Sequence, residues 1–200
     1  MTIISPDVKE IFAHYWCTYG GWSALIKSSY LHVAIFFLIP TCNFWLNEEW
    51  WDQSILVLPN MLGFSLAGFA MFLALGDEKF REMLTEVEEQ ESSSLYVSLC
   101  ASFVHFILIQ LLALACAILA SSLDFYLPWP ADLRGMVDAC FALFGALGYL
   151  LFLYSLTSMM AATMAIFRTS SWYELHRKNE KHMTTANRQK SGSAKSVTPQ

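Results

Sequence analysis

Histidine and cysteine are the residues of this sequence best suited to metal binding or nucleophilic catalysis, but their spacing supports neither. The histidines are dispersed over the chain: His14, His32, His105, His176 and His182. The cysteines are scattered, odd in number and never in a CxxC pair: Cys17, Cys42, Cys100, Cys116 and Cys140. This pattern excludes a disulfide framework and a zinc knuckle, and predicts reduced thiols packed as small apolar residues.

The common enzyme motifs are absent as well. The chain contains no Walker loop, GxGxxG, HExxH or GxSxG. His105 and Gln110 lie five residues apart, so they do not share one stripe of a helix. A lone histidine in an apolar helix is more often a hydrogen-bonding residue than a ligand. We therefore predict that the protein is not an enzyme and needs no cofactor or metal.

A proline followed by an asparagine, Pro59 and Asn60, interrupts a long apolar segment. Proline removes a backbone donor and frees a carbonyl one turn back, which predicts a kink near Ile55. The Asn60 amide would satisfy such groups or reach a neighbouring helix, and Gly63 and Ala67 would let that helix approach. The four residues 59, 60, 63 and 67 are our candidate for a packing seam or, in an oligomer, a pore constriction.

The composition indicates whether water or lipid surrounds these residues. Hydrophobic residues make up 56% of the 200 residues and charged residues 14%, with a mean hydropathy of +0.42. Typical soluble domains have about 45–50% and about 25%. So apolar a chain cannot cover itself with polar surface, and we expect a lipid bilayer around it.

Four charge-free windows locate the expected spans: 28–47, 53–76, 92–123 and 139–167. Each reaches the length of about 20 residues that crosses a bilayer, and backbone groups in lipid must be satisfied within a helix. The predicted fold is an all-α membrane domain over 28–167, with spans at about 29–46, 54–76, 94–120 and 139–167. Pro40 and Asn43 interrupt the first span. The absence of charges within the windows also disfavours an ion-coupled transporter.

The distribution of Lys and Arg predicts the orientation. With four spans, eleven of the twelve basic residues lie on the side of both termini, and Arg134 alone lies opposite. Basic residues mark the cytoplasmic face, so we expect both termini inside. The predicted location is a bacterial inner membrane.

The leader, residues 1–27, has apolar residues at three- and four-residue steps. A helix is expected to begin at Asp7 and to break at Gly20 and Gly21. Such an aromatic, amphipathic segment lies in the headgroup plane of a membrane, or alternatively docks a partner.

The loop 77–91 is predicted to be an acidic helix on the cytoplasmic side. It is either a solvated extension of a neighbouring span or a partner-docking surface. The candidate docking residues form an apolar stripe with acidic neighbours: Phe80, Glu82, Leu84, Glu86, Val87 and Glu89.

The tail, residues 168–200, is polar and basic, which predicts a largely disordered cytoplasmic segment. Arg177, Lys178 and Lys181 lie in a basic cluster next to the last span and are candidates for contact with anionic lipid. A nucleic-acid-containing partner is the alternative, and we expect no direct sequence-specific binding of nucleic acid.

Residues 58–80 read LPNMLGFSLAGFAMFLALGDEKF. With the aromatic leader and the chain length, this stretch resembles the small multi-spanning inner-membrane effectors of bacterial antiphage systems, and most closely the transmembrane effectors of retrons. The resemblance implies an effector restrained by a reverse transcriptase with its RNA–DNA product. On infection, release would let it damage the inner membrane and stop growth.

Three functional hypotheses follow. The first is a membrane-perturbing effector controlled by cytoplasmic partners, acting as a homo-oligomer if it forms a pore. The second is a non-conducting anchor or accessory subunit of a cytoplasmic complex. The third, a small-solute transporter, lacks intramembrane ionisable groups.

Overall fold

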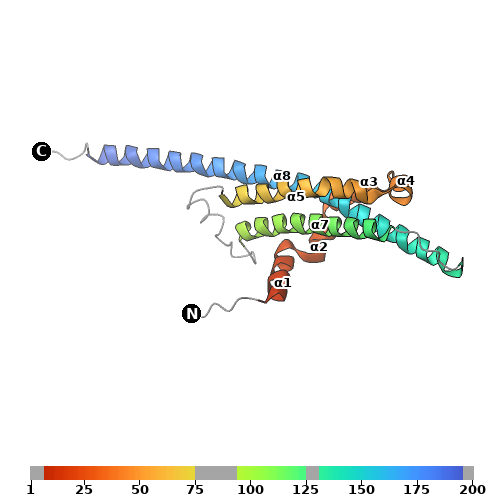
Figure 1. The fold of residues 1–200 in the computed structure, drawn as a ribbon. Helices are drawn as coiled ribbons and strands as arrows, with labels where there is room; N and C mark the ends of the chain where they lie inside the picture. The colour runs from red at the N-terminus through yellow and green to blue at the C-terminus, as the bar shows by residue number, and fades with distance from the viewer. Residues whose placement is uncertain (1–6, 75–93, 125–130, 196–200) are drawn as a thin grey trace.

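The computed structural model describes residues 7–74, 94–124 and 131–195, and in these ranges it contains helices and no strand. Figure 1 shows the helices in chain order: α1 (Val8–Tyr19), α2 (Gly21–Lys27), α3 (Ser29–Leu38), α4 (Cys42–Asn47), α5 (Trp50–Ala74), α7 (Leu95–Leu123) and α8 (Ala131–Lys195). The expected all-α class is confirmed for these residues.

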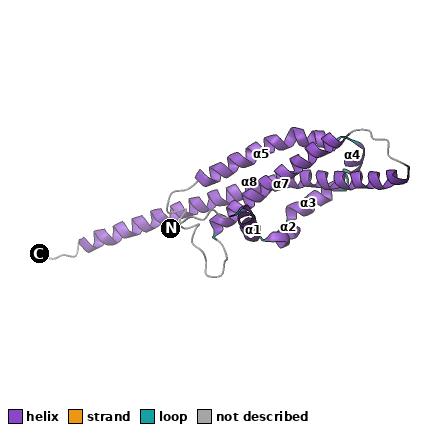
Figure 2. Ribbon diagram, turned by 60° about the horizontal axis from the view of Figure 1, so that its bottom comes forward, coloured by secondary structure: helices purple, strands orange, loops and turns teal. Residues whose placement is uncertain are grey.

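The long helices α5, α7 and α8 form a bundle in which each contacts the other two. They alternate in direction, so the beginning of α5, the end of α7 and the beginning of α8 lie at the same end (Figure 1). The shorter α3 packs along α8, and α1 packs on α7 (Figure 2). The Thr157 hydroxyl of α8 donates to the Tyr30 carbonyl at 3.0 Å, which ties α3 to the bundle.

Among the described residues, three helical segments are long and apolar enough to cross a membrane: α5, α7 and the part of α8 over Leu133–Lys178. The helices α2 and α3, bent by 54° at their junction, would make a fourth span if the pair is counted as one. Large apolar side chains cover the outer surface; Leu56 and Phe64 on α5 are 74% and 73% exposed. Helices of this length with so apolar a surface are consistent with a multi-pass membrane protein.

The first expected span, about 29–46, is not one continuous helix. α3 ends at Leu38, a turn follows, and α4 has only six residues. Pro40 has no N–H with which to extend α3. The Thr41 hydroxyl instead donates to the carbonyls of Phe37 and Leu38, at 2.7 and 3.2 Å, and so satisfies the helix end.

The leader follows the expected boundaries. α1 begins directly after Asp7 and ends at Gly20, whose φ of 101° is left-handed. Glycine adopts this conformation without strain, and a Cβ at Gly20 would lie 2.9 Å from the Cβ of Ala24. The break between α1 and α2 therefore depends on glycine.

The C-terminal segment differs from the expected disordered tail, because α8 runs without interruption to Lys195. It also begins earlier than the expected fourth span, at Ala131. No Pro or Gly occurs between residues 168 and 191 to stop the helix. Glu174 and Lys178 form an ion pair at 2.6 Å across one turn, and the Arg168 guanidinium lies 5.2 Å from the centre of the Trp172 ring.

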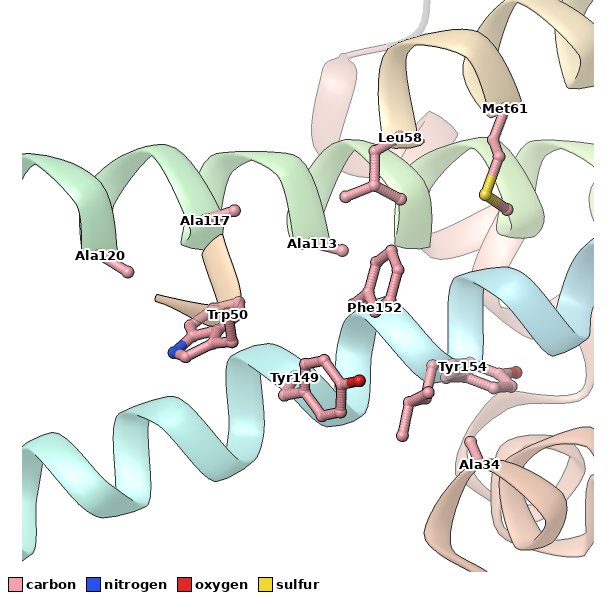
Figure 3. Close-up of a cluster of buried hydrophobic side chains, with 11 residues drawn as sticks. Ala34, Trp50, Leu58, Met61, Ala113, Ala117, Ala120, Tyr149, Phe152 and Tyr154 are labelled. Atoms are coloured by element: carbon pink, nitrogen blue, oxygen red, sulfur yellow. The ribbon is translucent and has the colours of Figure 1, made fainter. Parts of the chain in front are cut away.

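Two buried apolar clusters fill the bundle. The first lies toward the beginning of α5 and combines large side chains such as Trp50 and Phe152 with Ala113 and Ala117, both fully buried (Figure 3). The second lies toward the other end of the bundle and comprises Phe72, Leu99, Phe103, Phe106, Ala162 and Ala165. The small residues of α7 and α8 therefore mark helix contacts within one chain.

Candidate functional site

A layer of polar side chains lies between the two apolar clusters, and we call it the central polar layer. It comprises Ser65 of α5, His105 and Gln110 of α7, and Tyr154, Ser155 and Ser158 of α8, none more than 5% exposed. Polar groups in such a place must find partners inside the protein, because burial without a hydrogen bond costs about 1–3 kcal/mol.

His105 connects three helices. Its Nδ1 forms a hydrogen bond of 2.8 Å with the Tyr15 hydroxyl of α1, and its Nε2 forms one of 3.0 Å with the Tyr154 hydroxyl of α8. A neutral imidazole has one N–H and one lone pair, so one hydroxyl donates to it and the other accepts from it. The ring of Tyr19 stacks on the imidazole at 3.8 Å. His105 is thus a hydrogen-bonding residue, as expected, and it holds the leader to the bundle.

Tyr15 contributes a hydroxyl that stays protonated. Burial, with a smaller effect of the nearby Tyr154, raises the pKa of Tyr15 to about 12. Burial also raises the pKa of Tyr19. Both phenols therefore remain neutral around physiological pH, and the contact between α1 and His105 brings no charge into the bundle.

Gln110 joins α7 to α5 but is only partly satisfied. Its Nε2 donates to the Ser65 hydroxyl at 2.9 Å, while its fully buried Oε1 has no partner among the described residues. The carbonyl oxygen of the Gln110 side chain therefore lacks a hydrogen-bond donor among the described residues.

The serines of α8 bond to their own helix. The Ser155 hydroxyl donates to the Phe152 carbonyl at 2.7 Å, and that of Ser158 donates to the Ser155 carbonyl at 2.8 Å. Neither is paired with a base that would activate it as a nucleophile. Within the described ranges, no group of three His, Cys, Asp or Glu is placed to hold a metal ion. The chemistry that this layer performs is hydrogen bonding between helices.

The candidate seam lies elsewhere, on the outward face of α5. Pro59, Asn60, Gly63 and Ala67 are all exposed, and no atom of the described residues lies within 4 Å of the position a Cβ would take at Gly63. The Asn60 amide donates to the Leu56 carbonyl of its own helix at 3.2 Å. The structure thus brings the four residues together on one face, against which none of the described helices packs.

The other candidate residues are only partly placed. Arg177, Lys178 and Lys181 are exposed on α8, where Lys178 pairs with Glu174. The candidate docking residues lie outside the described residues: Phe80, Glu82, Leu84, Glu86, Val87 and Glu89.

Sequence reasoning missed three members of the buried hydrogen-bond network: Tyr15, Ser65 and Tyr154. The available signal was weak, namely hydroxyl-bearing side chains inside or beside apolar windows that also contain His105 and Gln110. Their partners are 45 to 90 residues apart in the sequence, so no local spacing reveals them. No protein-family model matches the chain, and no curated protein or solved structure is similar to it.

Proposed function

We propose that the protein is a membrane-embedded effector that associates with copies of itself and permeabilises the inner membrane when cytoplasmic partners release it. The observation that carries the proposal is the outward face of α5. There an exposed amide, Asn60, stands beside Gly63, above which the space is open.

This face has the features by which membrane helices associate. Small residues four apart let two backbones approach closely, and a polar side chain between them forms hydrogen bonds across the contact. Ala70 and Ala74 continue the stripe of Gly63 and Ala67 on the same exposed side of α5. A second copy of α5 would pack here at short distance and place two Asn60 amides near each other within the membrane.

Control from the cytoplasmic side is part of the proposal. The Lys/Arg asymmetry supports an orientation with both termini inside, and the acidic helix expected at 77–91 directly follows α5. The resemblance to retron effectors suggests a reverse transcriptase with its RNA–DNA product as the partner. Reversing Glu82, Glu86 and Glu89 to Lys is expected to abolish co-purification of that partner and to leave insertion intact.

The proposal is tested by changing side chains on the outward face of α5. Replacing Gly63 by Leu places bulk where two helices would meet, a change that costs about 1–3 kcal/mol in a well-packed contact. Replacing Asn60 by Leu removes the amide at similar volume. We expect both variants to insert normally but to lose depolarisation of the membrane after induction, Gly63→Leu more completely.

Ala115→Leu is the matched control, because Ala115 is a small exposed residue on α7, away from the face. It should depolarise cells like the parent protein. The measurement is membrane potential, normalised to protein in the membrane fraction. If Gly63→Leu and Asn60→Leu also depolarise like the parent, self-association through this face is refuted.

The second candidate function is a non-conducting anchor. The observation that favours it is α8, which continues past the span-like part Leu133–Lys178 to Lys195 and offers a long helical attachment. An anchor would leave the membrane potential unchanged on induction, and truncation after residue 178 would abolish partner capture without affecting insertion.

A further inference from the structure

A cavity of about 630 Å³ opens where α4, the beginning of α5, the end of α7 and the beginning of α8 meet, and we call it the end cavity. Two kinds of side chain line it. The aromatic lining comprises three tryptophans and two phenylalanines, Trp45, Trp50, Trp51, Phe141 and Phe144. The charged lining consists of four carboxylates, Glu48, Glu49, Asp124 and Asp138.

The carboxylates carry an unbalanced negative charge. Arg134, one turn before Asp138 on α8, is the single basic residue between positions 28 and 167 apart from Lys79 and Arg81, which precede α7. No three acidic residues in the described ranges are grouped closely enough to hold one metal ion. Charge spread around a wide, tryptophan-lined opening suits an organic ammonium group better than a bare metal ion.

Trp50 adds a hydrogen-bond donor, which favours an acceptor group in the ligand in addition to the cation that the carboxylates favour. Its side chain is only 2% exposed, and its indole N–H has no hydrogen-bond partner among the described residues. The neighbouring Trp45 differs, because its N–H donates to the Leu38 carbonyl at 3.1 Å. In Figure 3 the Trp50 nitrogen lies at the side of the ring that faces Ala120, which also lines the cavity.

The Trp50 ring is fixed in this position by close packing. A Cβ at Gly148 would lie 2.7 Å from its Cζ2, and one at Gly145 would lie 3.4 Å from its Nε1. Only glycine at 148 leaves room for the ring, so the N–H is held toward the cavity. A donor that borders the cavity in this way can pair with an acceptor oxygen of a ligand.

We propose that the end cavity binds the headgroup of a zwitterionic phospholipid. The carboxylates and the tryptophan faces attract its ammonium group, and the Trp50 N–H donates to an oxygen of its phosphate. Helix ends and tryptophans meet at this cavity, and both are typical of the headgroup level of a bilayer. This binding does not require the self-association proposed above.

The test compares ligands by their shift of the thermal unfolding midpoint of the full chain in detergent. The probes are dioctanoyl phosphatidylethanolamine, dioctanoyl phosphatidylglycerol with the same chains, free O-phosphoethanolamine, and calcium chloride. We expect a concentration-dependent rise with phosphatidylethanolamine and a much smaller one with the other three.

Variants then locate the binding. Glu48→Gln together with Glu49→Gln should weaken the apparent affinity for phosphatidylethanolamine about tenfold, the order of one charge-assisted hydrogen bond. Asp52→Asn is the matched control, because Asp52 is an exposed carboxylate of the same segment that does not line the cavity. Trp50→Phe keeps an aromatic ring, removes the N–H and should also weaken binding.

Either of two results would overturn binding at this site, and a third would overturn the lipid as its ligand. One is equal stabilisation by phosphatidylethanolamine and phosphatidylglycerol, or by calcium. The other is unchanged affinity in the double Gln variant when that variant unfolds at the parent's midpoint without lipid. Stabilisation by O-phosphoethanolamine equal to that by the lipid would replace the lipid by a soluble headgroup compound and so refute the lipid assignment.

Discussion

Asn60 and Gln110 are both amides in the middle of long apolar helices, yet they lie in opposite environments. Gln110 is fully buried in the central polar layer and donates across the bundle to Ser65, whereas Asn60 is exposed and donates to the carbonyl of Leu56 on its own helix. The amide group alone therefore does not determine the environment. What decides is whether another helix offers a partner within reach.

The comparison extends to the small residues beside them. Gly148 faces the Trp50 ring so closely that no Cβ fits, whereas the corresponding space at Gly63 is empty. The face at Gly148 is already packed within the chain, whereas the face at Gly63 contacts none of the described helices. Substitutions that are identical in chemistry should therefore have different effects at the two places.

The largest effect is expected at His105, the centre of the buried network. His105→Ala removes the hydrogen-bond partner of the Tyr15 hydroxyl and one partner of the Tyr154 hydroxyl, and it opens a cavity, which should lower the free energy of unfolding by about 3 kcal/mol. It should also release α1, seen as faster proteolysis of the leader. Unfolding by titration with SDS in mixed micelles measures the first effect. A loss below about 1 kcal/mol would mean that the network contributes little.

The next largest effect on the free energy of unfolding is expected from comparing substitutions at two glycines, Gly148 and Gly63. Gly148→Ala places a methyl group against the Trp50 ring and should cost about 2 kcal/mol by overpacking. Gly63→Ala should be neutral or stabilise by up to about 1 kcal/mol, because alanine favours a helix more than glycine does. The same SDS titration compares the two variants. Equal values would remove the distinction between a packed and a free face.

The Gln110–Ser65 pair should show a smaller, asymmetric effect. Ser65→Ala leaves the whole Gln110 amide without partners and should cost about 1 kcal/mol. Gln110→Leu also removes the carbonyl that lacks a donor, so its cost should be smaller than that of Ser65→Ala. The double variant completes the cycle. If Gln110→Leu were the more damaging change, the unpaired carbonyl would have to be satisfied by water.

The smallest effect on stability is expected at Asn60, on the outward face. Its one hydrogen bond is within α5, so Asn60→Leu should change the free energy of unfolding of the monomer by less than about 0.5 kcal/mol. The variant is informative because the same change is expected to cause a loss of depolarisation, though a less complete one than Gly63→Leu. A large loss of monomer stability would place Asn60 in the structural core instead.

The sequence was sufficient to predict the three long helices but not their rotation. Charge-free windows correctly located α5, α7 and the apolar part of α8, because lipid demands length and hydrophobicity. In helices that are apolar on all sides, no periodic pattern tells the inner face from the outer face. The environments of Gly63 and Gly148 therefore became visible only in the structure.

The central polar layer and the tail show two further limits. His105 was correctly expected to form hydrogen bonds, but its partners Tyr15 and Tyr154 come from distant segments that only the fold brings together. The expectation of disorder after residue 168 relied on polarity alone. It overlooked that the segment lacks Pro and Gly up to residue 191 and continues from a formed helix, so extending it requires no new nucleation.

The length of α8 has a mechanical consequence. A helix of 65 residues measures about 98 Å at 1.5 Å per residue, roughly three times the thickness of the hydrocarbon core of a bilayer. Its contacts with α3, α5 and α7 hold this helix in the bundle, so a force applied near its C-terminal end would have a long lever arm. A partner pulling near Lys195 would move that end of α8 over a large distance with a small force. At Gly148 the movement would be small and the force large. The Trp50 ring packs so closely against Gly148 that α8 has no room to shift there.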